Sequence, residues 1–387
     1  MATPITDDTG GPGGATRGIR LGSVLGAPVL LMPSWFLIAL LITVSYTPMA
    51  RVRLPDAGGL AILVAFGAAL LLLLSVFLHE LAHALAARAV GTPPSHIVLD
   101  LWGGHTAFDA DLTTPARSAL VSVVGPATNA ALALFGWLVR PAADPGGVAE
   151  LLLIGLIYSN AIVAVFNALP GLPLDGGRAL EALVWKLTGD RGAGTIAAAW
   201  TGRAVAAGLA FWAVGRPLLQ GRTPSLITGI WMLLIAWMLW QGATAALTIG
   251  HWRRRAPGLS VQALARPAAG LPVLSPLSEV VAHARSVGAA EIVLLDDGAR
   301  PVGVVDHTAL ASVPADRLPV TPARAVARVL PPQATVPAAL AGEALLAHLR
   351  ATAHHEYAVL DPHGRVVGML NGLDVQAHLD GRRPERA

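Results

Sequence analysis

Long apolar runs occupy the first part of the chain, and a mixed pattern follows them. Residues 24–250 hold stretches of about 20 mostly apolar residues, the length that crosses a bilayer as a helix. Residues 259–380 alternate short apolar runs with polar positions, as soluble globular domains do. The pattern therefore predicts a membrane domain followed by a soluble domain.

Six apolar runs predict six membrane helices. We expect them over residues 28–46, 58–78, 118–139, 151–169, 193–214 and 225–247. The fifth run is the weakest because Arg203 interrupts it, and we place Arg203 near the cytoplasmic end of its helix, where the side chain reaches the interface. Lys and Arg are in excess on the side that carries both termini, so the positive-inside rule predicts that both termini are cytoplasmic.

The soluble part contains an internal repeat with a period of about 60 residues. Each copy reads as strand, tight turn, strand and helix. The expected strands cover residues 292–295 and 301–305 in the first copy and 357–360 and 366–370 in the second, with helices that begin at Asp306 and Asn371. A further helix is predicted over residues 338–350. The predicted fold class is an α-helical polytopic membrane domain of about six helices followed by an α/β soluble domain.

Composition and charge limit the residue types that can bind a metal and the classes of partner that the chain can have. The chain is 54% hydrophobic and 13% charged, whereas soluble domains carry about a quarter charged residues. It contains no Cys, so any metal site must use His, Asp or Glu. The net charge of +3 fits the cytoplasmic loops of a membrane protein, and we expect no nucleic-acid partner. The abundance of Arg and Ala favours a bacterial source, with the plasma membrane as the location.

The same patterns set the expected domain boundaries. Residues 1–26 are rich in Gly, Thr and Pro and lack the apolar core of a cleaved signal peptide, so we expect a disordered cytoplasmic tail there. The membrane domain is expected over residues 27–250, a linker over 251–258, the soluble domain over 259–380 and a short tail over 381–387.

His79, Glu80 and His83 form an H-E-x-x-H motif at the end of the second apolar run. Residues four apart lie on one face of a helix, so the two imidazoles can bind one zinc ion. Glu80 is placed to take a proton from a zinc-activated water and to deliver it to the leaving amine. Ionisable residues at membrane depth are costly, which favours a functional role. The alternative interpretation is that the helix ends at Leu78 and that the motif lies in an interfacial turn.

A catalytic zinc needs a third protein ligand and an open position for water. The best candidate is Asp175, which follows the fourth apolar run. Pro170 and Pro173 break a helix there, and Gly176 and Gly177 permit unusual backbone angles. Irregular backbone at membrane depth is tolerated where protein or a water-filled cavity covers it. A polar loop in which Asp175 caps a helix is the alternative interpretation.

The H-E-x-x-H motif and a later N-x-x-P-x-x-P-x-D-G motif that begins at Asn167 together resemble the site-2 protease family of intramembrane metalloproteases. The resemblance covers residues 20–250, with the two motifs in the family's order. It implies one catalytic acid and base, Glu80, and three ligands of one Zn²⁺ per chain, His79, His83 and Asp175. It also implies hydrolysis of peptide bonds in or near transmembrane segments of a membrane-protein substrate, often in regulated intramembrane proteolysis that releases a transcription regulator.

Three asparagines accompany the motifs. Asn129 ends a Gly-Pro-x-x-Asn sequence in the third run that also matches the family. Asn160 and Asn167 are seven residues apart, two turns along one face of the fourth run. All three are candidates to bind the substrate backbone or to stabilise the transition-state oxyanion. The alternative is that they bond one helix to another, as polar residues in membrane bundles commonly do.

Residues 101–106, between the second and third runs, contain two glycines. Similar proteases carry a membrane-associated hairpin here, and an extended substrate can pair with the edge of such a hairpin by strand addition. A simple interfacial loop is the alternative. His96 and His105 belong to no motif, and we interpret them as surface or interface residues, with gating of the metal site as a second option for His105.

The two repeated units resemble a pair of cystathionine-beta-synthase (CBS) domains. The resemblance rests on residues 303–310 and 368–375. Such pairs often bind adenine nucleotides, and a Thr or Ser followed three residues later by Asp then contacts ribose and phosphate. The first unit has Asp306 and Ala309 at these places, and the second has Asn371 and Asp374, so only Asp374 keeps the acid. The resemblance implies an adenine nucleotide at Asp374 or, alternatively, a module for homodimerisation or docking.

The predicted function is that of an intramembrane zinc endopeptidase regulated by its cytoplasmic CBS pair. The alternatives are a CBS-regulated membrane transporter and a catalytically inactive membrane scaffold. The combined motifs disfavour a transporter, and the complete ligand set together with Glu80 disfavours a scaffold.

Overall fold

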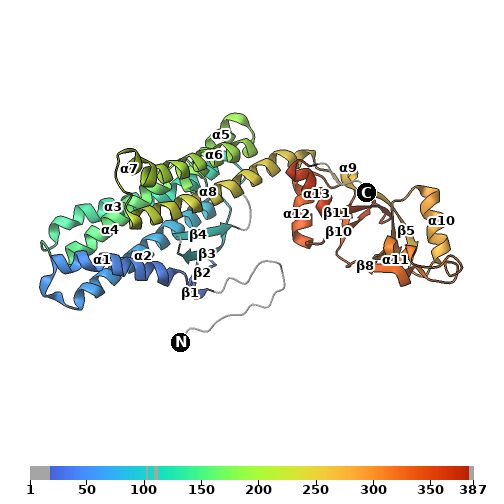
Figure 1. Ribbon diagram of the computed structural model, residues 1–387, viewed down its shortest axis with the longest axis horizontal. Helices are drawn as coiled ribbons and strands as arrows, with labels where there is room; N and C mark the ends of the chain where they lie inside the picture. Colours follow the sequence, from blue (N-terminus) through green and yellow to red (C-terminus); the bar gives the residue numbers. More distant parts are fainter. Residues whose placement is uncertain (1–17, 102, 109–111, 383–387) are drawn as a thin grey trace. The chain divides into compact units, whose positions relative to one another are not determined.

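The chain folds into two compact units, one that ends at Gly250 and one that begins at His251. The structure is a computed structural model that describes residues 18–101, 103–108 and 112–382. Long helices dominate the first unit, and a sheet with short helices forms the second (Figure 1). The first unit contains the apolar runs of the sequence, and the second contains the repeat.

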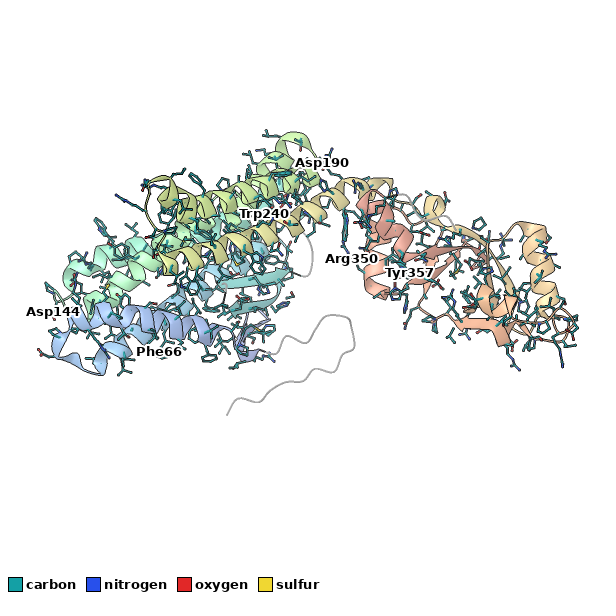
Figure 2. All side chains as sticks on the ribbon, viewed as in Figure 1. Phe66, Asp144, Asp190, Trp240, Arg350 and Tyr357 are labelled. Atoms are coloured by element: carbon teal, nitrogen blue, oxygen red, sulfur yellow. The ribbon has the colours of Figure 1, made fainter. Side chains whose placement is uncertain are left out.

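Six helices among the described residues are long and apolar enough to cross a membrane. They are α1 (Trp35–Arg53), α2 (Leu60–Ala89), α3 (Pro115–Val139), α4 (Val148–Asn167), α6 (Arg191–Ala210) and α8 (Leu226–Arg255). Apolar side chains also cover their outward faces, as expected where lipid replaces water. Phe66 of α2, labelled in Figure 2, is one of these exposed side chains. The predicted fold class is confirmed.

The fifth membrane helix is longer than the sequence suggested. A π-helical turn at Phe211–Gly215 and the short α7 (Arg216–Leu219) extend α6 into one apolar stretch of 29 residues. Arg203 lies in the middle of this stretch, about 18 Å along the axis from its first residue, Arg191. The predicted position of Arg203 near a helix end is therefore wrong.

A four-stranded sheet packs against α2. Its order is β1 (Ile19–Val24), β2 (Ala27–Leu31), β3 (Pro94–Asp100) and β4 (Gly103–Phe108). The pairs β1–β2 and β3–β4 are antiparallel, and β2–β3 is parallel. Val29, Leu31, Ile97 and Leu99 of this sheet share a buried core with α1 and α2. The predicted hairpin around residues 101–106 is thus part of a larger sheet.

Strand β1 corrects the expected disordered tail over residues 1–26. Leu25 and Gly26 both have positive φ, 57° and 89°, which is the backbone of a tight two-residue hairpin turn. This turn folds Ile19–Val24 back onto β2, so the tail prediction fails for these residues, while residues 1–17 lie outside the described part. The first helix begins at Trp35 rather than at residue 28, because Ala27–Leu31 alternates buried and half-buried positions as a strand.

The segment between α4 and α5 (Asp175–Thr188) is irregular, as Pro170 and Pro173 predict. Gly176 and Gly177 are required for space rather than for unusual backbone angles. A Cβ on Gly176 would lie 2.3 Å from the Ala168 carbonyl oxygen, and one on Gly177 would lie 2.2 Å from the Gly171 carbonyl carbon. The first turn of α5 therefore packs directly on the backbone of the preceding loop.

The second unit is built on a seven-stranded sheet with the order β8-β7-β6-β5-β11-β10-β9. The strands are β5 (Arg266–Pro272), β6 (Glu291–Leu295), β7 (Pro301–Val305), β8 (Ala327–Val329), β9 (Thr335–Pro337), β10 (Glu356–Leu360) and β11 (Val366–Asn371). The helices include α10 (Leu277–Val287), α11 (His307–Ala311), α12 (Gly342–Thr352) and α13 (Gly372–Asp380). The antiparallel hairpins β6–β7 and β10–β11 are the two copies of the repeat, and each leads into a short helix.

The ends of the repeat helices follow the sequence closely. Asp306 and Asn371 are the N-caps of α11 and α13, and their side chains accept hydrogen bonds from backbone N–H groups of the first turn. The helix predicted over residues 338–350 begins only at Gly342. The prediction placed its start too early because tertiary contacts hold the residues before Gly342 outside the helix: the Ala338 N–H donates to the Leu360 carbonyl oxygen, and Ala341 forms a bridge with Ser260.

Candidate metal centre

Helix α2 presents the H-E-x-x-H motif. The helix runs without a break from Leu60 to Ala89, so the alternative in which it ends at Leu78 is wrong. His79 and His83 lie one turn apart and are 6% and 7% exposed, and Glu80 between them is 5% exposed. The motif therefore lies in the interior of the helix bundle.

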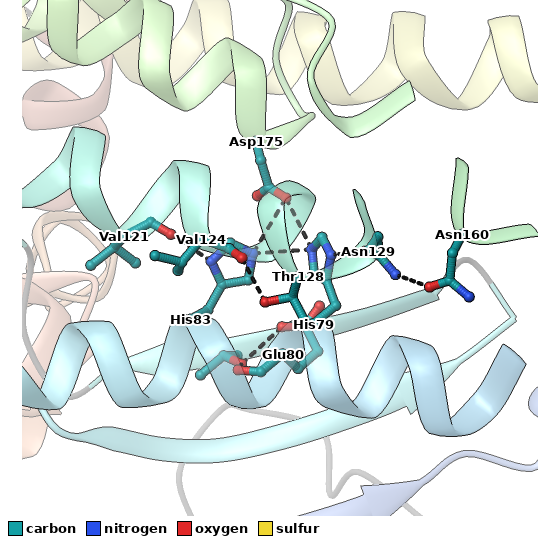
Figure 3. A network of polar contacts seen from close by, with 10 residues as sticks. His79, Glu80, His83, Val121, Val124, Thr128, Asn129, Asn160 and Asp175 are labelled. Atoms are coloured by element: carbon teal, nitrogen blue, oxygen red, sulfur yellow. Dashed lines mark hydrogen bonds and ion pairs between the residues drawn. The ribbon is translucent and has the colours of Figure 1, made fainter. Parts of the chain in front are cut away.

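Asp175, the first residue of α5, meets the two imidazoles (Figure 3). Its Oδ2 atom lies 3.0 Å from His79 Nε2 and 3.3 Å from His83 Nε2, and the two Nε2 atoms are 3.1 Å apart. Zinc bonds of about 2.0–2.1 Å at tetrahedral angles place ligand atoms about 3.3 Å apart. The observed triangle therefore has the size that one zinc ion requires.

The other ring nitrogens orient the two histidines. His79 Nδ1 bonds to Asn129 Oδ1, and His83 Nδ1 lies 2.6 Å from the Val121 carbonyl oxygen. Both partners accept hydrogen bonds, so each Nδ1 carries the proton and each Nε2 presents a lone pair. Two lone pairs and a carboxylate oxygen then point at one another, an arrangement that a cation stabilises. The donor set thus fits a metal ion.

Gly125 gives the histidines the room that they occupy. A Cβ at this position would lie 2.3 Å from His83 Nε2 and 2.6 Å from His79 Nε2. Val121, Gly125 and Asn129 follow one another at four-residue spacing, so they form one stripe of α3 that faces the motif. This four-residue spacing could have indicated from the sequence that Gly125 faces the motif. The match to the Gly-Pro-x-x-Asn sequence did not by itself explain why a glycine is needed there.

Glu80 faces the sheet. The hydroxyl of Thr106 in β4 donates a hydrogen bond of 2.8 Å to Glu80 Oε2. A Cβ on Gly104 would lie 2.6 Å from Glu80 Cγ, so the backbone of β4 packs directly on this side chain. The sequence did not identify Thr106, because the contact joins a helix and a strand that only the fold brings together.

The three predicted asparagines have different surroundings. Asn129 and Asn160 are fully buried, and Asn129 Nδ2 donates a hydrogen bond of 2.7 Å to Asn160 Oδ1. Asn160 in turn donates to Ser75 Oγ at 3.0 Å. These two residues thus form a hydrogen-bonded chain that ends on His79, whereas Asn167 lies at the end of α4 and lines the cavity beside the metal centre.

That cavity has a volume of about 830 Å³. His79, Glu80, His83 and Asp175 line it, together with residues of α3, α4, β4 and α8. His105 also lines it, whereas neither His105 nor His96 belongs to the group of converging ligand atoms among the described residues. The space is large enough for an extended peptide segment of a few residues beside the metal centre.

In the second unit, Asp374 is buried in α13. Its Oδ2 atom forms an ion pair of 3.1 Å with Arg266 of β5. The predicted nucleotide contact at this position stays a prediction, and its carboxylate is already engaged within the chain.

Comparisons with known proteins find curated relatives but no matching family model. A Synechocystis protein and the Mycobacterium tuberculosis protein Rip3, each named "Putative zinc metalloprotease", are 37% and 38% identical to the chain over 227 and 184 residues. The alignments cover 58% and 47% of this chain and 58% and 46% of the relatives. The chain thus spans about half the length of the curated relatives that it matches.

Two solved structures each resemble part of the chain. The site-2 protease from Methanocaldococcus jannaschii is 24% identical with a TM-score of 0.41, and the match covers 59% of this chain and 95% of that one. The CBS domain of a bacterial CNNM/CorC family Mg²⁺ transporter is 20% identical with a TM-score of 0.26, and covers 39% and 93%. The motifs, the described helices of membrane-spanning length and the curated relatives agree: over about half of its length, the chain is similar to proteins named as putative zinc metalloproteases.

Proposed function

We propose that the chain is an intramembrane zinc endopeptidase that cuts membrane proteins in or near their transmembrane segments. The observation that carries this proposal is the convergence of Asp175 with His79 and His83, which lie beside Glu80 on a helix of membrane-spanning length. These three residues would hold one zinc ion per chain, which would supply Lewis-acid activation of water and polarisation of the scissile carbonyl.

The residues around the centre have distinct roles in this proposal. Glu80 accepts the proton of the attacking water and passes it to the leaving amine, and Thr106 orients its carboxylate. Asn129 and the Val121 carbonyl hold the imidazoles in the tautomer that leaves Nε2 free. Asn167, which lines the cavity, is the amide that we assign to the substrate carbonyl in the transition state.

Strand β4 is the surface that we assign to substrate pairing. It is the last strand of the order β1-β2-β3-β4, so its outer edge has no partner strand among the described residues. Gly104 and Thr106 of this strand already touch Glu80. A substrate segment added to this edge would lie extended beside the catalytic carboxylate, and peptide hydrolysis requires an extended backbone.

The topology and the regulation belong to the same proposal. The distribution of Lys and Arg favours cytoplasmic termini in a bacterial plasma membrane. The CBS pair then acts in the cytoplasm as a regulatory module, with homodimerisation and an adenine nucleotide at Asp374 as its candidate interactions. A nucleotide that uses Asp374 must share or displace Arg266.

Comparing the membrane proteomes of cells that contain either wild-type protein or the Glu80→Gln variant tests the function. The amide keeps the size of the side chain but cannot take the proton, so we expect uncut membrane proteins to accumulate in the variant. Thr248→Val, a change outside the centre, is the matched control and should behave as wild type. Identical fragment patterns in wild type and Glu80→Gln would favour an inactive scaffold over a protease.

A further inference from the structure

Arg203 is a cation in the middle of an apolar helix, and it is held there by aromatic rings. Its guanidinium carbon lies 5.0 Å from the ring centroid of Trp200 in α6 and 4.9 Å from that of Trp240 in α8. Its Nη2 atom donates a hydrogen bond of 3.0 Å to Thr244 Oγ1, also in α8. A charge at such a position is retained only where specific partners stabilise it. Arg203 therefore joins α6 to α8, whose Trp240 is labelled in Figure 2.

The helical turns of α6 and α8 that Arg203 connects also pack against the loop that leads to Asp175. We call residues 168–174 the aspartate loop. A Cβ on Gly202, the neighbour of Arg203, would lie 2.0 Å from the Leu172 carbonyl oxygen. A Cβ on Gly242, between Trp240 and Thr244, would lie 2.7 Å from Pro173 Cγ. Helices α6 and α8 therefore both contact the aspartate loop, and they do so through residues close in sequence to Arg203 and to those that bind it.

The loop is fixed further by a backbone bond and by packing. The Leu172 N–H donates a hydrogen bond of 2.9 Å to the Ala198 carbonyl oxygen in α6. Leu174 is buried in a cluster with Ala206 of α6 and Leu239 of α8. Asp175 follows Leu174 directly, so the packing of α6 and α8 on this loop adjoins the carboxylate that meets the two histidines.

We propose that Arg203 is a positioning residue for the metal centre. By binding Trp240 and Thr244, it holds α8 against α6 around the aspartate loop, and this fixes Asp175 at its distance from His79 and His83. The inference rests on the metal centre of the proposed function, but it does not depend on proteolysis. Direct outer partners of metal ligands typically contribute about tenfold to a hundredfold in metal affinity, and Arg203 acts one step further out, so we expect an effect at the lower end of this range.

Binding of Co²⁺ to the full-length protein in detergent micelles tests this role. The visible absorption of bound Co²⁺ reports coordination geometry, and a titration gives affinity without any activity assay. We expect Arg203→Leu to weaken Co²⁺ binding about tenfold and to alter the spectrum. Arg203→Lys should restore part of the affinity, since it keeps a cation between the rings but loses the planar fork.

Thr244→Val and Thr248→Val form a matched pair for the same titration. Thr244 accepts the hydrogen bond of Arg203, whereas the Thr248 hydroxyl donates to the Thr244 carbonyl of its own helix. We expect weaker Co²⁺ binding for Thr244→Val and wild-type binding for Thr248→Val, and this pair decides the matter if Arg203→Leu does not fold. If Thr244→Val and every folded Arg203 variant bind Co²⁺ with wild-type affinity and spectrum, the positioning role of Arg203 is wrong, while the metal centre itself stands. Absence of Co²⁺ binding in the wild type would overturn the metal centre and the inference with it.

Discussion

Gly125→Ala is predicted to destroy the metal centre without removing any ligand. The added methyl group would lie 2.3 Å from His83 Nε2 and 2.6 Å from His79 Nε2, whereas ordinary van der Waals contact begins at 3.4 Å. Both imidazoles must therefore retreat by about 1 Å, or α3 must move away from α2 by as much. Metal sites require ligand distances within about 0.2 Å, so a displacement of this size is several times the tolerance.

We expect zinc affinity to fall by at least about a hundredfold in Gly125→Ala, since a misplacement of about 1 Å in a functional site has effects of that order. The assay is competition for zinc against a chelator of known affinity, with the purified full-length protein. Gly208→Ala is the matched control, because a Cβ there meets nothing within 4 Å. This control should bind zinc as the wild type does. If Gly125→Ala also binds zinc with wild-type affinity, the assignment of the site between α2 and α3 is wrong.

Three further predictions concern the surroundings of the site and the second unit. Asn129→Ala removes the acceptor of His79, so zinc affinity in the chelator assay should fall about tenfold to a hundredfold, and unchanged affinity would contradict the orienting role. Thr106→Val leaves Glu80 without its hydroxyl donor, so we expect slower turnover at unchanged zinc content, and a loss of zinc instead would place Thr106 in the ligand shell. Backbone N–H groups and an arginine hold the pKa of Asp361 below its usual value, so its contribution to stability is present above about pH 4 and is lost as the pH falls through the lowered pKa. Asp361→Asn should therefore lower the unfolding temperature of the second unit at pH 7 but not at pH 2, and equal shifts at both pH values would refute this.

Local patterns were enough to predict much of the fold. The membrane helices follow from the length of the apolar runs, and the hairpins β6–β7 and β10–β11 follow from alternation around tight turns. Strand β1 was missed because a short polar and apolar mixture next to the N-terminus carries no periodicity of its own. The strand forms because it pairs with β2, and local strand propensity does not encode such a tertiary contact.

The candidate site was predictable where the separation of residues along the chain fixes their geometry. His79 and His83 share a helix face because they are four residues apart, and Asp175 stood out as a carboxylate in a proline-broken segment. The bond between Asn129 and Asn160 matches the alternative in which the asparagines join one helix to another. The contacts of Ser75 and Thr106 were not predictable, because they act through residues of other elements. Arg203 was misplaced for a related reason. From sequence alone an arginine is expected to reach the membrane interface, whereas two tryptophans and a threonine hold it inside the bundle.

The zinc content of the purified full-length protein tests the central claim most directly. We predict about one zinc ion per chain in the wild type and in Glu80→Gln, and almost none in His79→Ala and Asp175→Ala, because a site with two protein ligands loses most of its affinity. Zinc that persists in both His79→Ala and Asp175→Ala, or a wild-type protein that binds no zinc, would contradict it.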